Sequence, residues 1–448
     1  MTIDEHRRPE KFHRLRGSMT QISATLQNTS RRAFIGTASA NLLIAVSSTI
    51  GGIIAARLLG PSGRGELAAA TAWAGILSVI ATLGLPQAIT FYTARNPAKL
   101  GDIFSASLFL LAIQGCVIVA GGWIATTIIL GRFQPTALPP VQIYLFSVPF
   151  SLLVTYLSTM AQGLNRFRLF NGLRLASAVG FPLVMIFGLL IGISDAKSIV
   201  TLMLVAQIAT ASVGLVFFVT RNRPKVRIRR SQVWELLRYG SKSYLGSLSW
   251  IANARLDQLI MSAFVGLGEL GIYAVAVSYS TVLFPLSGAF AMVLFPRVAG
   301  ERREAAGKTI KRALRANLIV SSTGALLLAF ISPFLLPLLF GVEFNGAVLP
   351  AIILLVAIVL LGFNYVLSDG LRGIGRPGIT SLAELLGTAI TIVGLFMLLP
   401  RIGIYGAALT SILSYLSVSA VLSLAFRQYV CSTGDVHIQD NEPPIALM

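Results

Sequence analysis

An apolar stretch near the middle of the chain carries three polar side chains that are rare inside a membrane. Asn253, Arg255 and Asp257 lie within a span expected at 243–265. Ionisable groups in a bilayer are costly and commonly mark functional sites. On a continuous helix Asn253 and Asp257 share a face at i and i+4, whereas Arg255 and Asp257 point about 200° apart. Two interpretations stay open: a cavity-facing cation for an anionic substrate, with Asp257 as tuner or proton site, or an ion pair between helices.

Other charged residues lie close to the ends of expected spans. Arg57 ends the first span, where it either snorkels to the interface or forms the rim of a cationic cavity. Glu384 lies near one end of the span at 379–399, as an interfacial carboxylate or an ion-coupling site. Asp369 and Arg372, at i and i+3, are predicted to pair on a helix surface.

Histidine, the commonest metal ligand, and the nucleotide-binding Walker A motif are absent from the expected spans. All three histidines (His6, His13 and His437) lie in the tails, and no Walker A sequence occurs. The pattern GLGELG at 266–271 matches a dinucleotide motif but lies between two spans, so a tight interhelical turn is predicted instead. We therefore expect no enzyme, cofactor or metal site. A membrane glycan polymerase or ligase stays an alternative that would require long outer loops.

The elements that must position these residues are transmembrane helices. The chain has 448 residues, 55% hydrophobic and 12% charged, with a mean hydropathy of +0.78. Because a helical span needs about 20 apolar residues, an all-α polytopic membrane protein with about 12 transmembrane helices is predicted. The expected spans are 33–59, 67–92, 103–130, 138–162, 169–192, 198–220, 243–265, 270–296, 313–340, 347–371, 379–399 and 403–426. Prolines within them are candidate hinges: Pro86, Pro149, Pro182, Pro285, Pro333 and Pro337.

The basic residues orient these spans. With the N-terminus in the cytoplasm, 30 Lys and Arg residues fall on the cytoplasmic side and 5 on the other, which predicts that both termini are cytoplasmic. This asymmetry accounts for much of the net charge of +19. The basic loops 221–242 and 297–315 are explained by topology, with binding of anionic lipid headgroups as the alternative and nucleic acid disfavoured.

The spans form two similar halves. GELAAA at 65–70 resembles GIYAVA at 271–276, an offset of 206, and QGLNR at 162–166 resembles RGIGR at 372–376, an offset of 210. Two six-helix lobes of equal polarity are predicted, related by a pseudo-twofold axis along the membrane normal, as in parallel-repeat transporters. The expected organisation is a basic N-terminal tail at 1–32, an N-lobe at 33–220, a basic cytoplasmic linker at 221–242, a C-lobe at 243–427 and a C-terminal tail at 428–448.

Short motifs recur at fixed places relative to these spans. They are RLLGPSGRGEL at 57–67, QGLNR at 162–166, NARLDQL at 253–259, LFPR at 294–297 and LRGIGRP at 371–377. In this order, over residues 33–427, the chain resembles bacterial polysaccharide and O-antigen repeat-unit flippases of the multidrug/oligosaccharidyl-lipid/polysaccharide exporter superfamily.

The resemblance implies translocation of undecaprenyl-diphosphate-linked oligosaccharide from the inner to the outer leaflet of the bacterial cytoplasmic membrane. The product would enter O-antigen, capsule or exopolysaccharide. It implies a cationic substrate cavity, for which the candidates are Arg255, Arg57, Arg297 and Asn253, with Asp257 and Glu384 as candidate ion-coupling residues. The implied partners are the lipid-linked oligosaccharide, membrane lipids, a polysaccharide polymerase and a chain-length regulator, and no nucleic acid.

Two related transporter classes fit less well. Ion-driven multidrug antiporters of the superfamily usually carry an acid in the first span, where this chain has none and Asn41 is the most polar deep residue. Such an antiporter is the alternative function. Flippases for lipid-linked peptidoglycan precursors typically have fourteen spans, two more than are predicted here.

Overall fold

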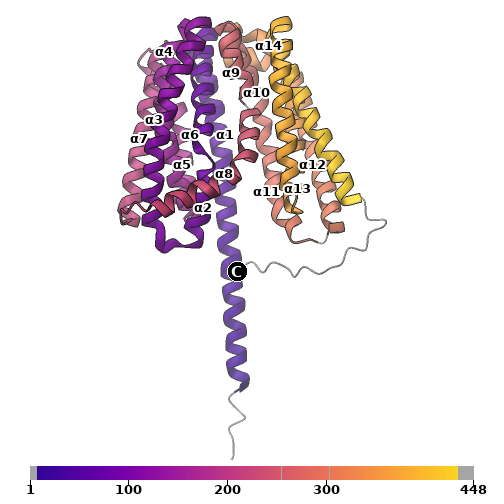
Figure 1. Cartoon of the computed structure of the whole chain (residues 1–448). Coiled ribbons are helices and arrows are strands. Elements are labelled where there is room, and N and C mark those ends of the chain that lie inside the picture. The colour runs from indigo at the N-terminus through magenta and orange to yellow at the C-terminus, as the bar shows by residue number, and fades with distance from the viewer. Residues whose placement is uncertain (1–7, 254, 302, 432–448) are drawn as a thin grey trace, which may run out of the picture. The chain divides into compact units, whose positions relative to one another are not determined.

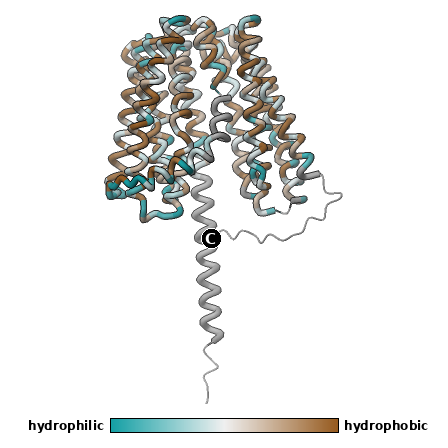
Figure 2. Tube along the Cα trace, viewed as in Figure 1, coloured by the Kyte–Doolittle hydropathy of each residue, from teal (hydrophilic) through white to brown (hydrophobic). Residues whose placement is uncertain are grey.

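A computed structural model describes the backbone of residues 8–253, 255–301 and 303–431. Its side chains are described from Gly36 to Gln428, apart from residues 242–243, 245–254, 296 and 302–303. Within this part of the chain the secondary structure is helical and contains no strand. Hydrophobic residues dominate the lengths of the helices, and hydrophilic residues gather near helix ends (Figure 2). The prediction of an all-α polytopic membrane protein is confirmed.

The helices follow one another with short connections (Figure 1). The α-helices are α1 (Arg8–Thr82), α2 (Leu85–Arg95), α3 (Leu100–Phe133), α4 (Leu138–Leu145), α5 (Ser147–Gly163), α6 (Phe167–Leu190), α7 (Ala196–Asn222), α8 (Arg230–Asn253), α9 (Leu256–Phe264), α10 (Leu267–Ser280), α11 (Phe284–Ala299), α12 (Arg303–Phe340), α13 (Val348–Gly373) and α14 (Pro377–Cys431). Four 3₁₀ helices join them: η1 (Pro97–Lys99), η2 (Pro135–Ala137), η3 (Thr281–Leu283) and η4 (Val342–Ala347).

The described residues contain nine helical segments long and apolar enough to cross a membrane. Two of these segments hold two predicted spans each. The first reverses at Gly60 (φ 63°) inside α1, and the other at Gly403 (φ 56°) inside α14. Positive φ favours glycine because other side chains clash there. The predicted span 243–265 falls across α8 and α9, outside the nine segments, and together these account for the twelve spans expected.

The chain divides into two compact units. Unit 1 comprises Met1–Leu245, Gln258–Ser278 and Pro337–Asn345, and unit 2 comprises Gly246–Asp257, Tyr279–Leu336 and Gly346–Met448. In unit 1 the core lies among α2, α3, α5, α6 and α7. In unit 2 it lies among α11, α12, α13 and α14.

Three prolines of the predicted spans lie where a new helix starts. Pro86 lies in the first turn of α2, Pro149 in that of α5 and Pro285 in that of α11. The missing proline N–H costs nothing in a first turn, because that donor has no partner within the helix. The spans at 138–162 and 270–296 are therefore each built from two helices rather than one.

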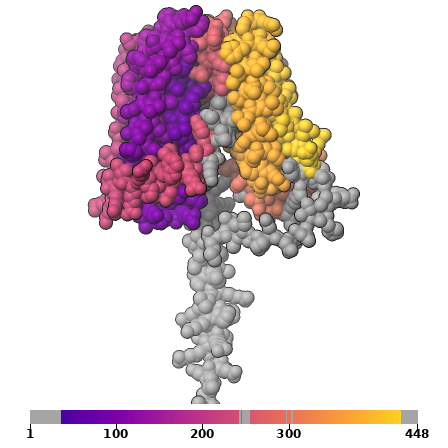
Figure 3. Space-filling view, viewed as in Figure 1, coloured from indigo at the N-terminus to yellow at the C-terminus, as the bar shows by residue number. Residues whose placement is uncertain are grey.

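The segment expected to link the two halves packs onto unit 1. We name residues 223–241 the strap. Its Arg229 Nε lies 3.2 Å from Asp102 Oδ2, and the ring of Tyr239 stacks on Phe91 with centroids 4.6 Å apart. In the space-filling view this segment lies against the first helices of unit 1 (Figure 3). The strap is thus a packed element of unit 1.

The two repeated glycine motifs contact each other within unit 1. A Cβ added to Gly271 in α10 would overlap the carbonyl oxygen of Pro61 in α1, and one added to Gly65 would overlap that of Leu267. Two side-chain hydrogen bonds also join α1 to α9 and α10: Trp73 Nε1 donates to Ser262 Oγ at 3.0 Å, and Arg64 Nη2 donates to Ser278 Oγ at 3.3 Å. Backbone therefore meets backbone at this point, with no room for a side chain.

Asp195 caps α7 in the connection between α6 and α7. Its Oδ2 accepts a hydrogen bond from the backbone N–H of Ser198 at 2.8 Å, and this bond holds the pKa of the carboxyl below its ordinary value. The stabilisation is therefore present above the ordinary pKa and is lost as pH falls through the lowered pKa.

We expect Asp195→Ala to lower the free energy of unfolding by about 1 kcal/mol near neutral pH because the cap is lost. Thermal unfolding measures this change. Asp195→Asn is the control, which should keep the cap and remove its pH dependence; equal stability of all three proteins would contradict the capping role.

Candidate functional site

The polar residues of the seventh predicted span lie at a junction between two helices. α8 ends at Asn253 and α9 begins at Leu256, with Arg255 in a turn. The expectation that Asn253 and Asp257 share one helix face is therefore wrong, because no continuous helix joins them. The side chain of Asn253 lies outside the described residues. Asp257 is buried in the first turn of α9, where a carboxylate is favoured by the helix dipole, whereas Arg255 is exposed.

The two candidate ion-coupling carboxylates both lie in unit 2 and are buried. Glu384 in α14 is 6% exposed and Asp257 is 8% exposed. Asp369 and Arg372 form the predicted pair on α13, with Oδ1 and Nη1 3.2 Å apart.

Arg57 contacts the end of another helix. Its Nε donates to the carbonyl oxygen of Leu339 at 2.7 Å, and its Nη2 donates to that of Leu338. These carbonyls belong to the last turn of α12, which lacks intrahelical donors and favours a cation. Arg57 therefore caps α12 within unit 1, a role that the sequence did not reveal.

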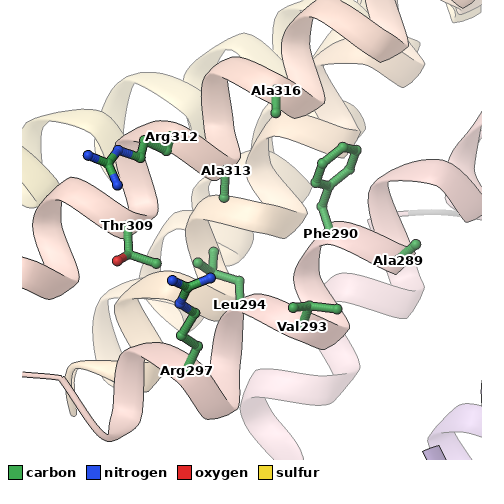
Figure 4. Close-up of a pocket in the computed structure, with 9 residues that line it drawn as sticks. All are labelled: Ala289, Phe290, Val293, Leu294, Arg297, Thr309, Arg312, Ala313 and Ala316. Atoms are coloured by element: carbon green, nitrogen blue, oxygen red, sulfur yellow. The ribbon is translucent and has the colours of Figure 1, made fainter.

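Arg297 lines a cavity in unit 2 between α11 and α12. The cavity has a volume of about 530 Å³. The guanidinium groups of Arg297 and Arg312 and the hydroxyl of Thr309 gather toward one side, while Phe290 and Val293 lie on the other (Figure 4). The remaining lining residues are Ala289, Leu294, Ala313 and Ala316. The cavity thus joins a cationic end to an apolar wall.

A carboxylate organises the cationic end. Glu301 Oε1 lies 3.3 Å from Arg297 Nε, and Glu301 Oε2 accepts a hydrogen bond from Thr309 Oγ1 at 2.6 Å. The side chain of Arg297 is 67% exposed, so this pair contributes little to stability, at most about 1 kcal/mol. The Glu301 carboxylate instead restrains the Arg297 guanidinium beside the cavity. Sequence reasoning missed Arg312 and Thr309 because the whole basic loop was explained by topology.

The arrangement suits an amphiphilic anion. Guanidinium groups bind phosphate oxygens with two parallel hydrogen bonds, and two of them can hold a diphosphate. An apolar wall next to them suits a lipid chain. Within the described residues no group of His, Cys, Asp and Glu has the placement of a metal site.

Comparison with known proteins identifies the family. Residues 30–300, more than half of the chain, match the family described as polysaccharide biosynthesis protein. The chain belongs to this family. It is 24% identical over 251 residues to a probable low-salt glycan biosynthesis flippase of Haloferax volcanii, and 28% identical over 200 residues to an uncharacterized membrane protein of Methanocaldococcus jannaschii. These alignments cover 55% and 43% of this chain, and 51% and 39% of the relatives, so the match spans about half of their length or less.

Solved structures show the same fold at low sequence identity. An inward-facing multidrug MATE transporter of the exporter superfamily superposes with a TM-score of 0.70 at 16% identity, covering 87% of this chain and 94% of the transporter. The lipid II flippase MurJ in an inward closed conformation gives 0.71 at 13% identity, covering 87% and 86%. The predicted two-lobed superfamily fold and family resemblance are confirmed. Of these proteins, the Haloferax volcanii relative is named a probable flippase, and the two solved structures are a transporter and a flippase.

Proposed function

We propose that this polysaccharide biosynthesis family member is a flippase for lipid-linked oligosaccharide. The cargo is a repeat unit on undecaprenyl diphosphate, moved by alternating access from the inner to the outer leaflet of the bacterial cytoplasmic membrane for O-antigen, capsule or exopolysaccharide. The observation that carries the proposal is the cavity of unit 2, in which Arg297 and Arg312 stand beside an apolar wall.

The chemistry of this cavity matches the cargo where lipid and sugar are joined. A diphosphate carries several negative oxygens, which two guanidinium groups satisfy, and the polyprenyl chain remains in an apolar environment. Positive residues gather on the cytoplasmic side of membrane proteins, and Arg297 and Arg312 belong to the basic loop 297–315. This charge supports the proposal that the cavity receives cargo from the inner leaflet and that both chain termini lie in the cytoplasm.

The other candidate residues keep their proposed roles around this route. Arg255 and Asn253, at the junction of α8 and α9, and Arg57 are proposed as further contacts of the anionic cargo. Asp257 and Glu384 are the proposed ion-coupling carboxylates, and the burial of both side chains in unit 2 supports that role. A polysaccharide polymerase and a chain-length regulator are the proposed protein partners.

Deletion of the gene tests the function. We expect loss of the surface glycan and accumulation of diphosphate-linked repeat units on the cytoplasmic leaflet, restored by the intact gene. Purified protein in liposomes should also expose a labelled polyprenyl-diphosphate oligosaccharide to a reagent confined to the opposite side. Intact glycan in a host without a second flippase, together with new drug sensitivity, would replace the proposal with the antiporter alternative.

A further inference from the structure

A second hollow lies in unit 1, between α6 and α7. Its volume is about 1140 Å³. These two helices are joined by a short connection and pack side by side in opposite directions, so the start of α6 meets the end of α7. We name this hollow the α6–α7 groove. Nearly all of its lining residues belong to these two helices and the turn before α6.

One end of the groove is cationic. Arg166 and Arg168 come from the start of α6, and Arg221 comes from the last turn of α7. Arg166 donates a hydrogen bond to the neutral amide oxygen of Asn222 rather than to a carboxylate. Among the described residues that line the groove, none carries a negative charge. An anion at this end would therefore meet three arginines and, among the described lining residues, no opposing carboxylate.

The rest of the groove is apolar and open. Small residues on the facing helices, Ala176 on α6 and Ala209 and Gly214 on α7, leave the space that forms it. Val213 is 69% exposed and Phe217 is 48% exposed along its edge. From the arginines to Ala176 and Ala209 the groove extends about 15 Å at the helical rise of 1.5 Å per residue. That length accommodates much of a fatty acyl chain.

We propose that the α6–α7 groove binds an anionic phospholipid, with its phosphate on Arg168 and Arg221 and an acyl chain along the apolar part. Basic pockets between transmembrane helices on the cytoplasmic side suit anionic headgroups. Few neutral polar groups line the groove, mainly Asn165, Asn171 and Thr210, so a compact phosphate headgroup fits it better than an oligosaccharide. The lipid is a resident component of unit 1, and the proposal does not depend on which cargo the protein moves.

Two matched pairs of variants test the site. The first compares Arg168→Gln/Arg221→Gln with Arg230→Gln/Arg238→Gln, two exposed strap arginines that lie outside the groove lining and give the same loss of charge. The second compares Val213→Trp, which fills the groove, with Val216→Trp, at an exposed valine of α7 (62% exposed) that does not line it. The four substituted arginines, Arg168, Arg221, Arg230 and Arg238, are all exposed, so both arginine double variants are expected to fold.

The measurement is native mass spectrometry of purified protein in mixed micelles of dioleoyl phosphatidylglycerol and dioleoyl phosphatidylcholine. Wild-type protein should retain one phosphatidylglycerol in preference to phosphatidylcholine. Removing two charge-assisted contacts should lower that retention by about tenfold or more. Val213→Trp should lower it as well, whereas both control variants should stay close to wild type.

Two results would overturn the proposal. Equal loss in the groove and strap arginine variants would mean that surface charge alone attracts the lipid. Displacement of phosphatidylglycerol by undecaprenyl diphosphate at equimolar amounts would make the groove a cargo subsite instead of a site for a resident lipid. Neither result would decide whether the protein is a flippase, because lipid retention is measured without transport.

Discussion

Gly271→Ala should strongly destabilise the protein, whereas Gly268→Ala in the same helix should not. The added methyl group of Gly271→Ala would overlap the carbonyl of Pro61, which belongs to backbone and cannot rotate away. Relief requires α10 and the Pro61–Gly65 segment of α1 to move apart. Overpacking of this kind costs about 3 kcal/mol at the upper end of its usual range, which corresponds to a melting temperature lower by about 3 °C for a chain of 448 residues.

Gly268→Ala is the matched control because it changes the same residue type within the same α10 motif. A Cβ there would meet Ser62 Oγ at 3.8 Å, an ordinary contact. Alanine also favours helix formation, so this variant should be neutral or slightly more stable. Thermal unfolding of the detergent-purified proteins gives the comparison. Similar melting temperatures for the two variants would show that α1 and α10 do not pack backbone to backbone.

The spans were predictable because bilayer thickness fixes their length. What the apolar pattern could not show is where one helix stops within a span. Helix α4 ends at Leu145 and α10 ends at Ser280, and in each case a proline, Pro149 or Pro285, lies in the first turn of the next α-helix. The junction between Asn253 and Leu256 has no proline or glycine to mark it, and so the expected helical relation of Asn253 to Asp257 failed there.

The candidate sites were predictable only in part, for a similar reason. Basic residues in a membrane protein serve either to orient its spans or to bind a ligand, and both roles place arginines in the same loops. Arg297 was selected through a motif, but its neighbour Arg312 depends on the packing of α11 against α12. Arg57 shows a related case, since a residue selected for a cavity rim also contacts the carbonyls of Leu338 and Leu339. Tertiary contacts show whether an arginine lines a cavity or caps a helix, and a single sequence does not reveal those contacts.

The double variant Arg297→Gln/Arg312→Gln should reduce flipping of a polyprenyl-diphosphate oligosaccharide by about a hundredfold. Each guanidinium can supply charge-assisted hydrogen bonds to the diphosphate, and losing two such contacts accounts for that factor. Lys308→Gln/Arg315→Gln is the control, since both residues are exposed on α12 outside the cavity lining and belong to the same basic loop. It removes the same charge and should retain most of the activity.

Glu301→Gln separates the role of the cavity from that of the ion pair. Its carboxylate competes with a phosphate for Arg297, from which it lies 3.3 Å away. Removing that negative charge should keep or tighten binding of the anionic cargo, even though an ion pair and the restraint on Arg297 are weakened. The assay is initial flipping rate in liposomes at several cargo concentrations, with equal amounts of folded protein. If Glu301→Gln and the double arginine variant lose activity to the same extent, Arg297 serves the structure of the α11–α12 turn. If instead the cavity and control double variants lose activity equally, the two arginines act through topology and the proposed anion site is wrong.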